Sequence, residues 1–131
     1  MMRISRGLHD EIVEHALADA PDECCGLVAC RDGRAVEVIR MENTAHSPLR
    51  YEMDSGELYR EMMRIDAAGL EPGIIYHSHT RSGPYPSQTD INLAFYPDSL
   101  YVIVGTATPE PELRAYTIRD GAVQEADLRI I

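Results

Sequence analysis

The sequence contains no lysine, so all twelve of its basic residues are arginines, and they are outnumbered by 22 acidic residues. The formal net charge is −10 at pH 7. Nucleic-acid binding requires a positive face that neutralises phosphates and releases their counterions. The charge balance therefore argues against nucleic acid as a partner, and it leaves room for a protein or peptide partner with basic character.

Long hydrophobic runs are also missing. No apolar stretch approaches the roughly 18 to 20 residues that a membrane span needs, and residues 1–17 carry charges where a signal peptide would keep an apolar core. Cysteine is scarce, and the three that occur, Cys24, Cys25 and Cys30, do not suggest a disulfide framework. We therefore expect no membrane partner, reduced thiols and a cytoplasmic location.

The length of 131 residues suits a single domain spanning residues 1–131, and no internal repeat is visible. Hydrophobic periodicity and turn residues predict the following elements. Helices are expected at 8–20, 54–69 and 87–94. Strands are expected at 25–30, 35–41, 73–76, 100–105, 113–118 and 122–131, with some strand character at 51–53. This order indicates a mixed α/β or α+β domain in which helices pack on a largely antiparallel sheet.

The segment 76–90, "YHSHTRSGPYPSQTD", contains two histidines separated by one residue at the end of an expected strand. Residues i and i+2 of a strand face the same side, so His77 and His79 can direct two imidazoles at one point while Ser78 faces the other way. A His-x-His pair taken alone is more often an ordinary pair of side chains than a metal site.

Ser87 and Asp90 follow in the same segment and allow two readings. Ser followed three residues later by an acidic residue, directly after Pro86, is close to the capping box that begins a helix. The second reading makes Asp90 a metal ligand. The two readings are compatible, because a helix beginning at Ser87 would fix Asp90 in its first turn.

Two neutral imidazoles and one carboxylate suit Zn²⁺, with a fourth position left for water. Such a site lowers the pKa of the bound water and polarises a carbonyl oxygen, but it needs a separate carboxylate as base. Glu23, in "PDECCGLVAC" between a helix end and a strand start, is the best candidate for that base. The alternative is that Glu23 is a solvated surface charge.

Glu23, His77-x-His79, seven intervening residues, Ser87, two more residues and Asp90 together resemble the JAMM (MPN-plus) motif of zinc metalloproteases. The leading "PDECCGL" is similar to the Pro-x-Glu-x-Cys-Gly-x-Leu segment of that family. The resemblance covers nearly the whole chain. It implies an α+β, JAMM/MPN-like (cytidine-deaminase-like) domain with a curved, mostly antiparallel sheet flanked by helices.

The resemblance also implies an activity: hydrolysis of a peptide or isopeptide bond after the C-terminal Gly-Gly of a ubiquitin-like protein. His77, His79 and Asp90 would bind one Zn²⁺ per chain. Glu23 would act first as base and then as acid toward the leaving amine, and Ser87 would form a hydrogen bond with the developing oxyanion or with the water.

Within the family, the chain looks most like bacterial stand-alone Mec-type hydrolases, because Thr80 follows the second histidine and Ile75 precedes the motif. Eukaryotic deubiquitinases of the family usually have Pro and an aromatic residue at these two positions. The Mec-type resemblance implies release of cysteine, or of a C-terminal extension, from a sulfur-carrier protein. Two alternatives stay open: an isopeptidase that removes ubiquitin-like modifiers from lysines, and a non-catalytic MPN scaffold.

Several other residues are candidates for lesser roles. Cys25 lies near Glu23, but no paired histidine supports a nucleophile, so all three cysteines are predicted to be packing residues. His9 and His15 on the first helix are predicted at the surface or rim. The residues that could contact substrate from loops are His46, Arg81 and Tyr85.

Overall fold

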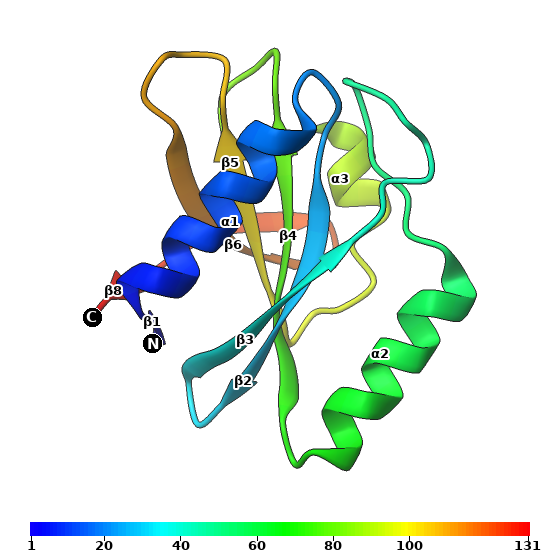
Figure 1. Cartoon of the computed structure of the whole chain (residues 1–131), viewed down its shortest axis with the longest axis vertical. Helices are drawn as coiled ribbons and strands as arrows, with labels where there is room; N and C mark the ends of the chain where they lie inside the picture. Colours follow the sequence, from blue (N-terminus) through cyan, green and yellow to red (C-terminus); the bar gives the residue numbers. More distant parts are fainter.

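The computed structural model describes residues 1–131 as one eight-stranded sheet with helices on both of its faces (Figure 1). The helices are α1 (Arg6–Asp19), α2 (Ser55–Ala67) and α3 (Gln88–Asn92). The strands are β1 (Met2–Ile4), β2 (Cys25–Arg31), β3 (Arg34–Met41), β4 (Glu71–His79), β5 (Leu100–Gly105), β6 (Glu112–Arg119), β7 (Ala122–Ala126) and β8 (Leu128–Ile130).

The strands follow the order β7-β6-β5-β4-β2-β3-β1-β8. The pairs β2–β3, β2–β4, β5–β6 and β6–β7 are antiparallel, whereas β4–β5, β1–β3 and β1–β8 are parallel. The sheet is therefore mixed, and the predicted α+β architecture with flanking helices is confirmed. The parallel pair β4–β5 is possible because α3 and its loops provide the crossover between the two strands.

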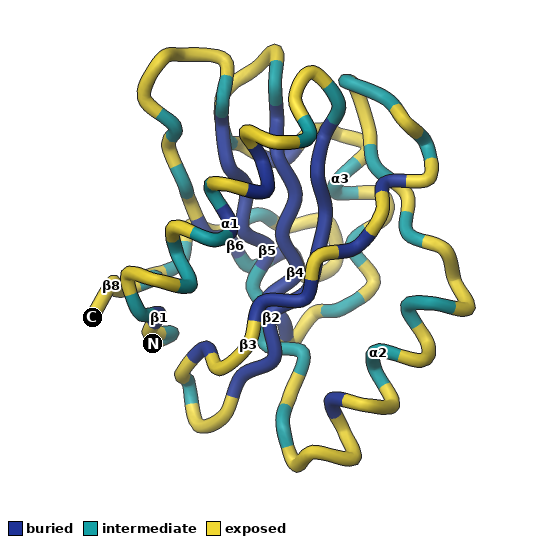
Figure 2. Tube along the Cα trace, viewed as in Figure 1, coloured by how far each residue is buried: buried dark blue, intermediate teal, exposed yellow.

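The side chains of β4 alternate between two hydrophobic cores, one on each face of the sheet. Ile74 and Tyr76 belong to the core that packs under α1, which contributes Ile12. Ile75 belongs to the core on the other face, together with Ile65 from α2. The strands at the centre of the sheet are accordingly buried along most of their length, whereas the outer turns of both long helices are exposed (Figure 2).

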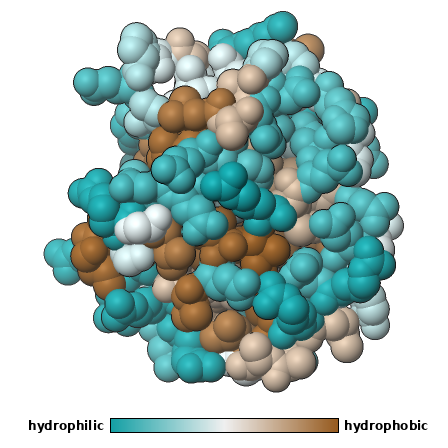
Figure 3. All heavy atoms as spheres, in the orientation of Figure 1, coloured by the Kyte–Doolittle hydropathy of each residue, from teal (hydrophilic) through white to brown (hydrophobic).

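The outer surface is mainly hydrophilic on the face seen in Figure 3, with hydrophobic patches toward its middle. No helix has the length and apolar character needed to cross a bilayer.

Local sequence signals place most turns correctly. The Asp32-Gly33 turn joins β2 to β3 with both residues at positive φ, as the hairpin signal predicts. Asp54 caps α2 by accepting a hydrogen bond from the backbone of Glu57. Gly69, at φ 72°, ends this helix in the left-handed conformation that glycine adopts freely.

Four expectations about the elements are wrong. The third helix ends at Asn92 rather than 94, the expected strand 122–131 is divided into β7 and β8, and the short strand β1 had not been predicted. Residues 51–53 form no strand, because the backbone of Glu52 bonds instead to the side chain of Asn43 and to Thr44.

Candidate metal centre

The pairing of β2 with β4 sets the relation between Glu23 and the two histidines. Cys25 lies opposite His77 in this antiparallel pair. Two further bonds extend the contact past the end of β2: the Ser78 amide donates to the Cys24 carbonyl at 3.2 Å, and the Cys24 amide donates to Ser78 Oγ at 2.8 Å. Continued by two residues, the register places Glu23 opposite His79. Residues directly opposite each other share a face, so Glu23 lies on the face that presents both imidazoles.

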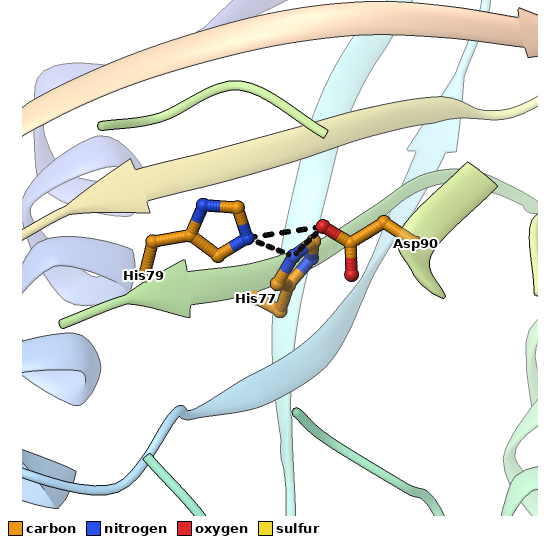
Figure 4. A group of neighbouring side chains, drawn as sticks. All are labelled: His77, His79 and Asp90. Carbon is orange, nitrogen blue, oxygen red and sulfur yellow. Dashed lines mark hydrogen bonds and ion pairs between the residues drawn. The ribbon is translucent and has the colours of Figure 1, made fainter. Parts of the chain in front are cut away.

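His77, His79 and Asp90 converge on one point, with both imidazoles from β4 and the carboxylate from α3 (Figure 4). The two Nε2 atoms are 3.2 Å apart, and Asp90 Oδ2 lies 3.1 Å from that of His77 and 3.0 Å from that of His79. Both histidines are buried, at 1 % and 4 % exposure. Sequence reasoning proposed these three residues as ligands, and the structure brings all three together.

The geometry fits a metal ion. A four-coordinate zinc ion about 2.0 to 2.1 Å from each ligand keeps neighbouring ligand atoms ~3.3 Å apart, close to the three separations in this cluster. The donor set of two imidazoles and one carboxylate is also one that zinc prefers. These three residues can therefore hold a divalent ion and leave a fourth position open.

The orientation of His79 is fixed by its second ring nitrogen. Nδ1 lies 2.9 Å from the Gly83 carbonyl, which can only accept, so Nδ1 carries the proton and Nε2 is free to act as a ligand. His77 is held differently: its ring stacks on Tyr51 with centroids 4.6 Å apart, and its buried Nδ1 has no hydrogen-bond partner.

Asp90 serves the start of α3 and the cluster with one carboxylate. The Ser87 amide donates to Asp90 Oδ2 at 2.9 Å, and the Asp90 amide donates to Ser87 Oγ at 3.1 Å. This reciprocal pair is a complete capping box. The capping-box reading of this segment is thus confirmed, and the same oxygen that bonds to the Ser87 amide faces the two histidines, where Asp90 could also act as a ligand.

The electrostatics of the cluster follow from burial and from these short contacts. Burial lowers the pKa of His77. Burial acts in the same direction on His79, but its contacts with Asp90 and Gly83 raise its pKa overall. Burial opposes ionisation of Asp90, yet the two histidines hold the pKa of this carboxyl well below its ordinary value. The cluster therefore keeps an ionised carboxylate at its centre, which favours a bound cation.

Glu23 is buried rather than solvated, with 4 % exposure, and its Oε1 has no hydrogen-bond partner. Burial raises the pKa of this carboxyl to about 7, with smaller effects from the charges of His79 and Asp90. A carboxyl with a pKa near neutrality can both accept and return a proton at physiological pH. The alternative of a solvated surface charge is thus excluded for this residue.

We expect Glu23→Gln to stabilise the metal-free protein by an amount that grows with pH. The pKa of this carboxyl is raised from an ordinary value of 4.5 to about 7 on folding. Its contribution to stability is therefore fully present below pH 4.5 and is lost as the pH rises to about 7. The free-energy difference between variant and wild type should change by about 3 kcal/mol over this interval.

Melting temperatures of chelator-treated protein, measured at several pH values across this range, test the expectation. Glu14→Gln, which removes one negative charge from the exposed side of α1, is the matched control. A difference between Glu23→Gln and wild type that does not vary with pH would contradict the burial of an ionisable group at this position.

Asn43 organises the loop beside Glu23, and sequence reasoning missed it. Its buried amide donates to the Glu23 carbonyl at 2.9 Å and to the Arg50 carbonyl at 3.1 Å. Its Oδ1 accepts bonds from the amides of Ala45 and Glu52, each at 3.0 Å. One side chain thus ties the loop that carries Tyr51 to the backbone of Glu23. An asparagine at a strand end before a Pro-containing loop is a weak signal, and only the structure shows its partners.

The loop between the ligands is held against the sheet. Gly105 leaves room for Pro84, since a Cβ there would lie 2.9 Å from the proline ring. Tyr116 Oη donates to the Pro84 carbonyl at 2.6 Å, and Tyr85 packs edge-on against Tyr116 while remaining 59 % exposed. Arg81 is also exposed. Both Arg81 and Tyr85 are therefore accessible to a substrate, and the contacts expected of them stay predictions.

Of the remaining candidates, the predictions for the cysteines and for His9 are confirmed, and the prediction for His15 is wrong. All three cysteines are buried and free, and burial raises the pKa of Cys25 to about 12, which is unfavourable for a nucleophile. His15 is not at the surface: it is 5 % exposed, and its Nδ1 lies 2.6 Å from the hydroxyl of Tyr76. The missed signal was its spacing, because His15 follows Ile12 by one helical turn on the apolar stripe. His9 is partly exposed, as predicted.

Residues 5–119 match the family described as prokaryotic homologs of the JAB domain. The chain is 43 % identical over 131 residues to the CysO-cysteine peptidase of Mycobacterium tuberculosis H37Rv, covering 98 % of this chain and 90 % of the relative. It is 36 % identical to a probable TtuB-protein conjugate cleaving protease of Thermus thermophilus, over 100 % and 84 % of the two chains. It is 32 % identical to a desampylase of Haloferax volcanii, over 88 % and 86 %.

Solved structures of other proteins share the fold of this chain. A protein of Desulfitobacterium hafniense, determined in solution, superposes with a TM-score of 0.86 at 28 % identity over 100 % of this chain and 93 % of its own. A structure described as JAMM, a metalloprotease-like zinc site in the proteasome and signalosome, superposes with a TM-score of 0.63 at 24 % identity, over 100 % and 98 %.

The fold and its cluster of potential ligands define a JAB-domain hydrolase of the peptidase class. More particularly, the chain belongs to the JAMM/MPN family, in its prokaryotic JAB branch, beside relatives named as a CysO-cysteine peptidase, a desampylase and a TtuB-protein conjugate cleaving protease.

Proposed function

We propose that this protein is a zinc-dependent peptidase that cleaves the bond after the C-terminal Gly-Gly of a ubiquitin-like protein. Its most direct reaction would release cysteine, or a C-terminal extension, from a sulfur-carrier protein. The observation that carries the proposal is the convergence of His77, His79 and Asp90 beside the buried carboxyl of Glu23. The relative named CysO-cysteine peptidase, which matches over nearly its full length, supports the choice of substrate.

His77, His79 and Asp90 would hold the ion, and a bound Zn²⁺ would supply a water of lowered pKa and polarise the scissile carbonyl. Glu23 takes the proton from the attacking water, because its pKa near 7 allows it to act as a base at neutral pH. The same carboxyl then returns that proton to the nitrogen of the leaving amine. The reaction needs both steps, since an amine leaves readily only when protonated.

Ser87 is proposed to stabilise the oxyanion that develops on the scissile carbonyl. Its Oγ accepts a bond from the Asp90 amide, so the hydroxyl proton remains free to donate. Ser87 is exposed at the start of α3, next to the ligand Asp90, where a substrate carbonyl can reach it. A donor placed at a developing negative charge contributes more to the transition state than to the ground state.

Two other functions remain alternatives: an isopeptidase and a non-catalytic scaffold. Removal of ubiquitin-like modifiers from lysines uses the same chemistry, and the similarity to a desampylase and to a TtuB-conjugate protease favours it as the second candidate. A non-catalytic scaffold is less consistent with the site, because all three ligand positions and Glu23 are retained.

We also propose that residues 1–131 act as a single catalytic domain in the cytoplasm, where the three free cysteines would remain reduced.

A direct assay tests the proposal. Zinc-loaded protein is incubated with a sulfur-carrier protein that ends in Gly-Gly-Cys, and separately with one joined through Gly-Gly to a lysine side chain. Mass spectrometry then shows whether the bond after the second glycine is cut. A carrier ending in Ala-Ala-Cys is the control and should be cut slowly or not at all. Intact substrates in every reaction with metal-loaded protein would overturn the proposed function.

A further inference from the structure

Glu23 lies outside the helices and strands, in the connection between the end of α1 and the start of β2. Its buried Oε1 has no hydrogen-bond partner, so the direction of this side chain depends on where its backbone is held. Both polar groups of that backbone bond to the segment 43–52. The Glu23 amide donates to the Ser47 carbonyl at 2.9 Å, and the Glu23 carbonyl accepts from Asn43 Nδ2 at 2.9 Å.

This segment contains no helix or strand, and the buried side chain of Asn43 closes its backbone into a loop. An asparagine amide offers two N–H donors and one oxygen with two lone pairs. The two donors reach the carbonyls of Glu23 and Arg50. The oxygen accepts from the amides of Ala45 and Glu52. All four bonding positions are therefore used, and only one orientation of the amide satisfies these four partners.

Two of these bonds hold the far end of the segment, where Tyr51 meets the metal centre. Asn43 bonds to the residue before Tyr51 and to the residue after it. The Tyr51 ring in turn stacks on His77, with centroids 4.6 Å apart and planes at 28°. His77 Nδ1 has no hydrogen-bond partner, unlike Nδ1 of His79, which bonds to the Gly83 carbonyl. The stack on Tyr51 thus takes the place of the hydrogen bond that usually orients a histidine ligand.

We propose that Asn43 is a positioning residue of the metal centre. It holds the backbone of Glu23 on one side and the loop that carries Tyr51 on the other, so that the base and the His77 ligand keep one relative position. The amide of Asn43 bonds to backbone groups alone, and it therefore acts through Glu23 and Tyr51. The inference rests on the proposed function and adds to it a residue that is neither a ligand nor a proton carrier.

Asn43→Ala removes both links at once. A displacement of about 1 Å in a catalytic group can lower a rate roughly 100-fold. Loss of a group that orients a metal ligand typically costs about 10- to 100-fold in metal affinity or activity. We therefore expect zinc-saturated Asn43→Ala to lose about 100-fold in kcat, with KM changed by less than about threefold, and to bind zinc about tenfold more weakly. A purely structural role would lower the melting temperature but leave kcat of the folded, zinc-saturated enzyme unchanged.

Zinc affinity tests the inference without a substrate. Zn²⁺ is titrated into metal-free wild type, Asn43→Ala and the matched control Thr44→Val, in competition with a chromophoric chelator. Thr44→Val removes the bond from Thr44 Oγ1 to the Glu52 carbonyl within the same segment, but the bond from the Thr44 amide to that carbonyl remains. The control should bind zinc as tightly as wild type, and Asn43→Ala should bind it more weakly.

Proton NMR of the metal-free proteins shows which contact has changed. Cross-peaks between the rings of Tyr51 and His77 should weaken in Asn43→Ala, because the loop no longer holds the tyrosine in place. Cross-peaks between His15 and Tyr76, which meet on the other face of the sheet, should keep their wild-type intensity. This second pair shows that the rest of the fold is intact.

Values of kcat and KM at saturating zinc, on a carrier ending in Gly-Gly-Cys, test the effect on catalysis. If Asn43→Ala does not fold, Asn43→Asp replaces it, because a carboxylate keeps the two acceptor bonds and loses the two donors; Thr44→Asp is then the control for the added charge. A position-43 variant that matches its control in kcat would overturn the inference and leave the proposed function intact. If wild type cuts no carrier, the proposed function fails, and zinc affinity decides the inference: equal affinities of variant and control overturn it.

Discussion

Glu23→Gln is expected to lower kcat/KM by about 10³-fold or more while leaving the metal content unchanged. The amide of glutamine has the size of the carboxyl but cannot accept the proton of water or deliver one to the leaving nitrogen. Glu23 is not among the three converging ligands, so its replacement removes no donor from them. Its backbone contacts, with the amide of Asn43 and the carbonyl of Ser47, do not involve the side chain.

Steady-state rates on a carrier ending in Gly-Gly-Cys, with zinc measured by elemental analysis on the same samples, test this expectation. Glu14→Gln serves as the control for loss of one acidic charge and should retain wild-type rates. A Glu23→Gln enzyme that hydrolyses substrate at the wild-type rate would show that another group carries the proton, and the mechanism proposed above would be wrong.

His77→Ala and Asp90→Asn are expected to remove metal and activity together. His77→Ala takes away one of three converging ligand atoms, and Asp90→Asn replaces an anionic carboxylate by a neutral amide, which is a poor ligand for zinc, so each variant leaves an incomplete site. Wild type should contain about one zinc per chain when purified without a histidine tag, and both variants should contain almost none. His9→Ala removes a histidine from α1 outside the cluster and should keep the wild-type metal content.

Thermal stability provides a second readout for these ligand variants. A ligand that binds only the folded protein stabilises it by about 4 kcal/mol at a thousandfold excess over its dissociation constant. Added zinc should therefore raise the melting temperature of wild type and of His9→Ala, with no rise for His77→Ala. Wild-type protein that stays free of metal even with zinc supplied would contradict the site and favour the scaffold alternative.

The metal cluster could be predicted from sequence because its signals are local. His77 and His79 share a face of a strand by the period of two, and Ser87 and Asp90 are joined by a capping box within one helical turn. The hairpin at Asp32 was equally predictable, since a two-residue turn depends on its own residues. Short-range geometry of this kind leaves the rest of the fold little freedom to alter it.

The position of Glu23 could not be derived from spacing alone, because it depends on the register of two strands some fifty residues apart. A shift of one residue in the pairing of Cys25 with His77 would turn Glu23 to the other face. The family resemblance associated Glu23 with His77 and His79, and the pairing of β2 with β4 explains physically why the three residues lie together. The bond from Asn43 to the Glu23 carbonyl was missed for a similar reason, since it joins residues 20 positions apart. The burial of His15 had a local signal in its spacing from Ile12, although its partner Tyr76 comes from a distant strand.

The double use of Asp90 constrains how this sequence could give rise to a pseudoenzyme. The helix that it caps has only five residues, too few to be stable without its first-turn bonds. A descendant that abandons catalysis by exchanging Asp90 for an apolar residue would at the same time lose the bond from the Ser87 amide to the Asp90 carboxylate, and only the Asp90 amide to Ser87 Oγ half of the capping box would remain. Substitution of His77 or Glu23 would abolish catalysis without removing a bond at the start of α3. We therefore expect Asp90 to be the last of these positions to change in a relative that has lost activity.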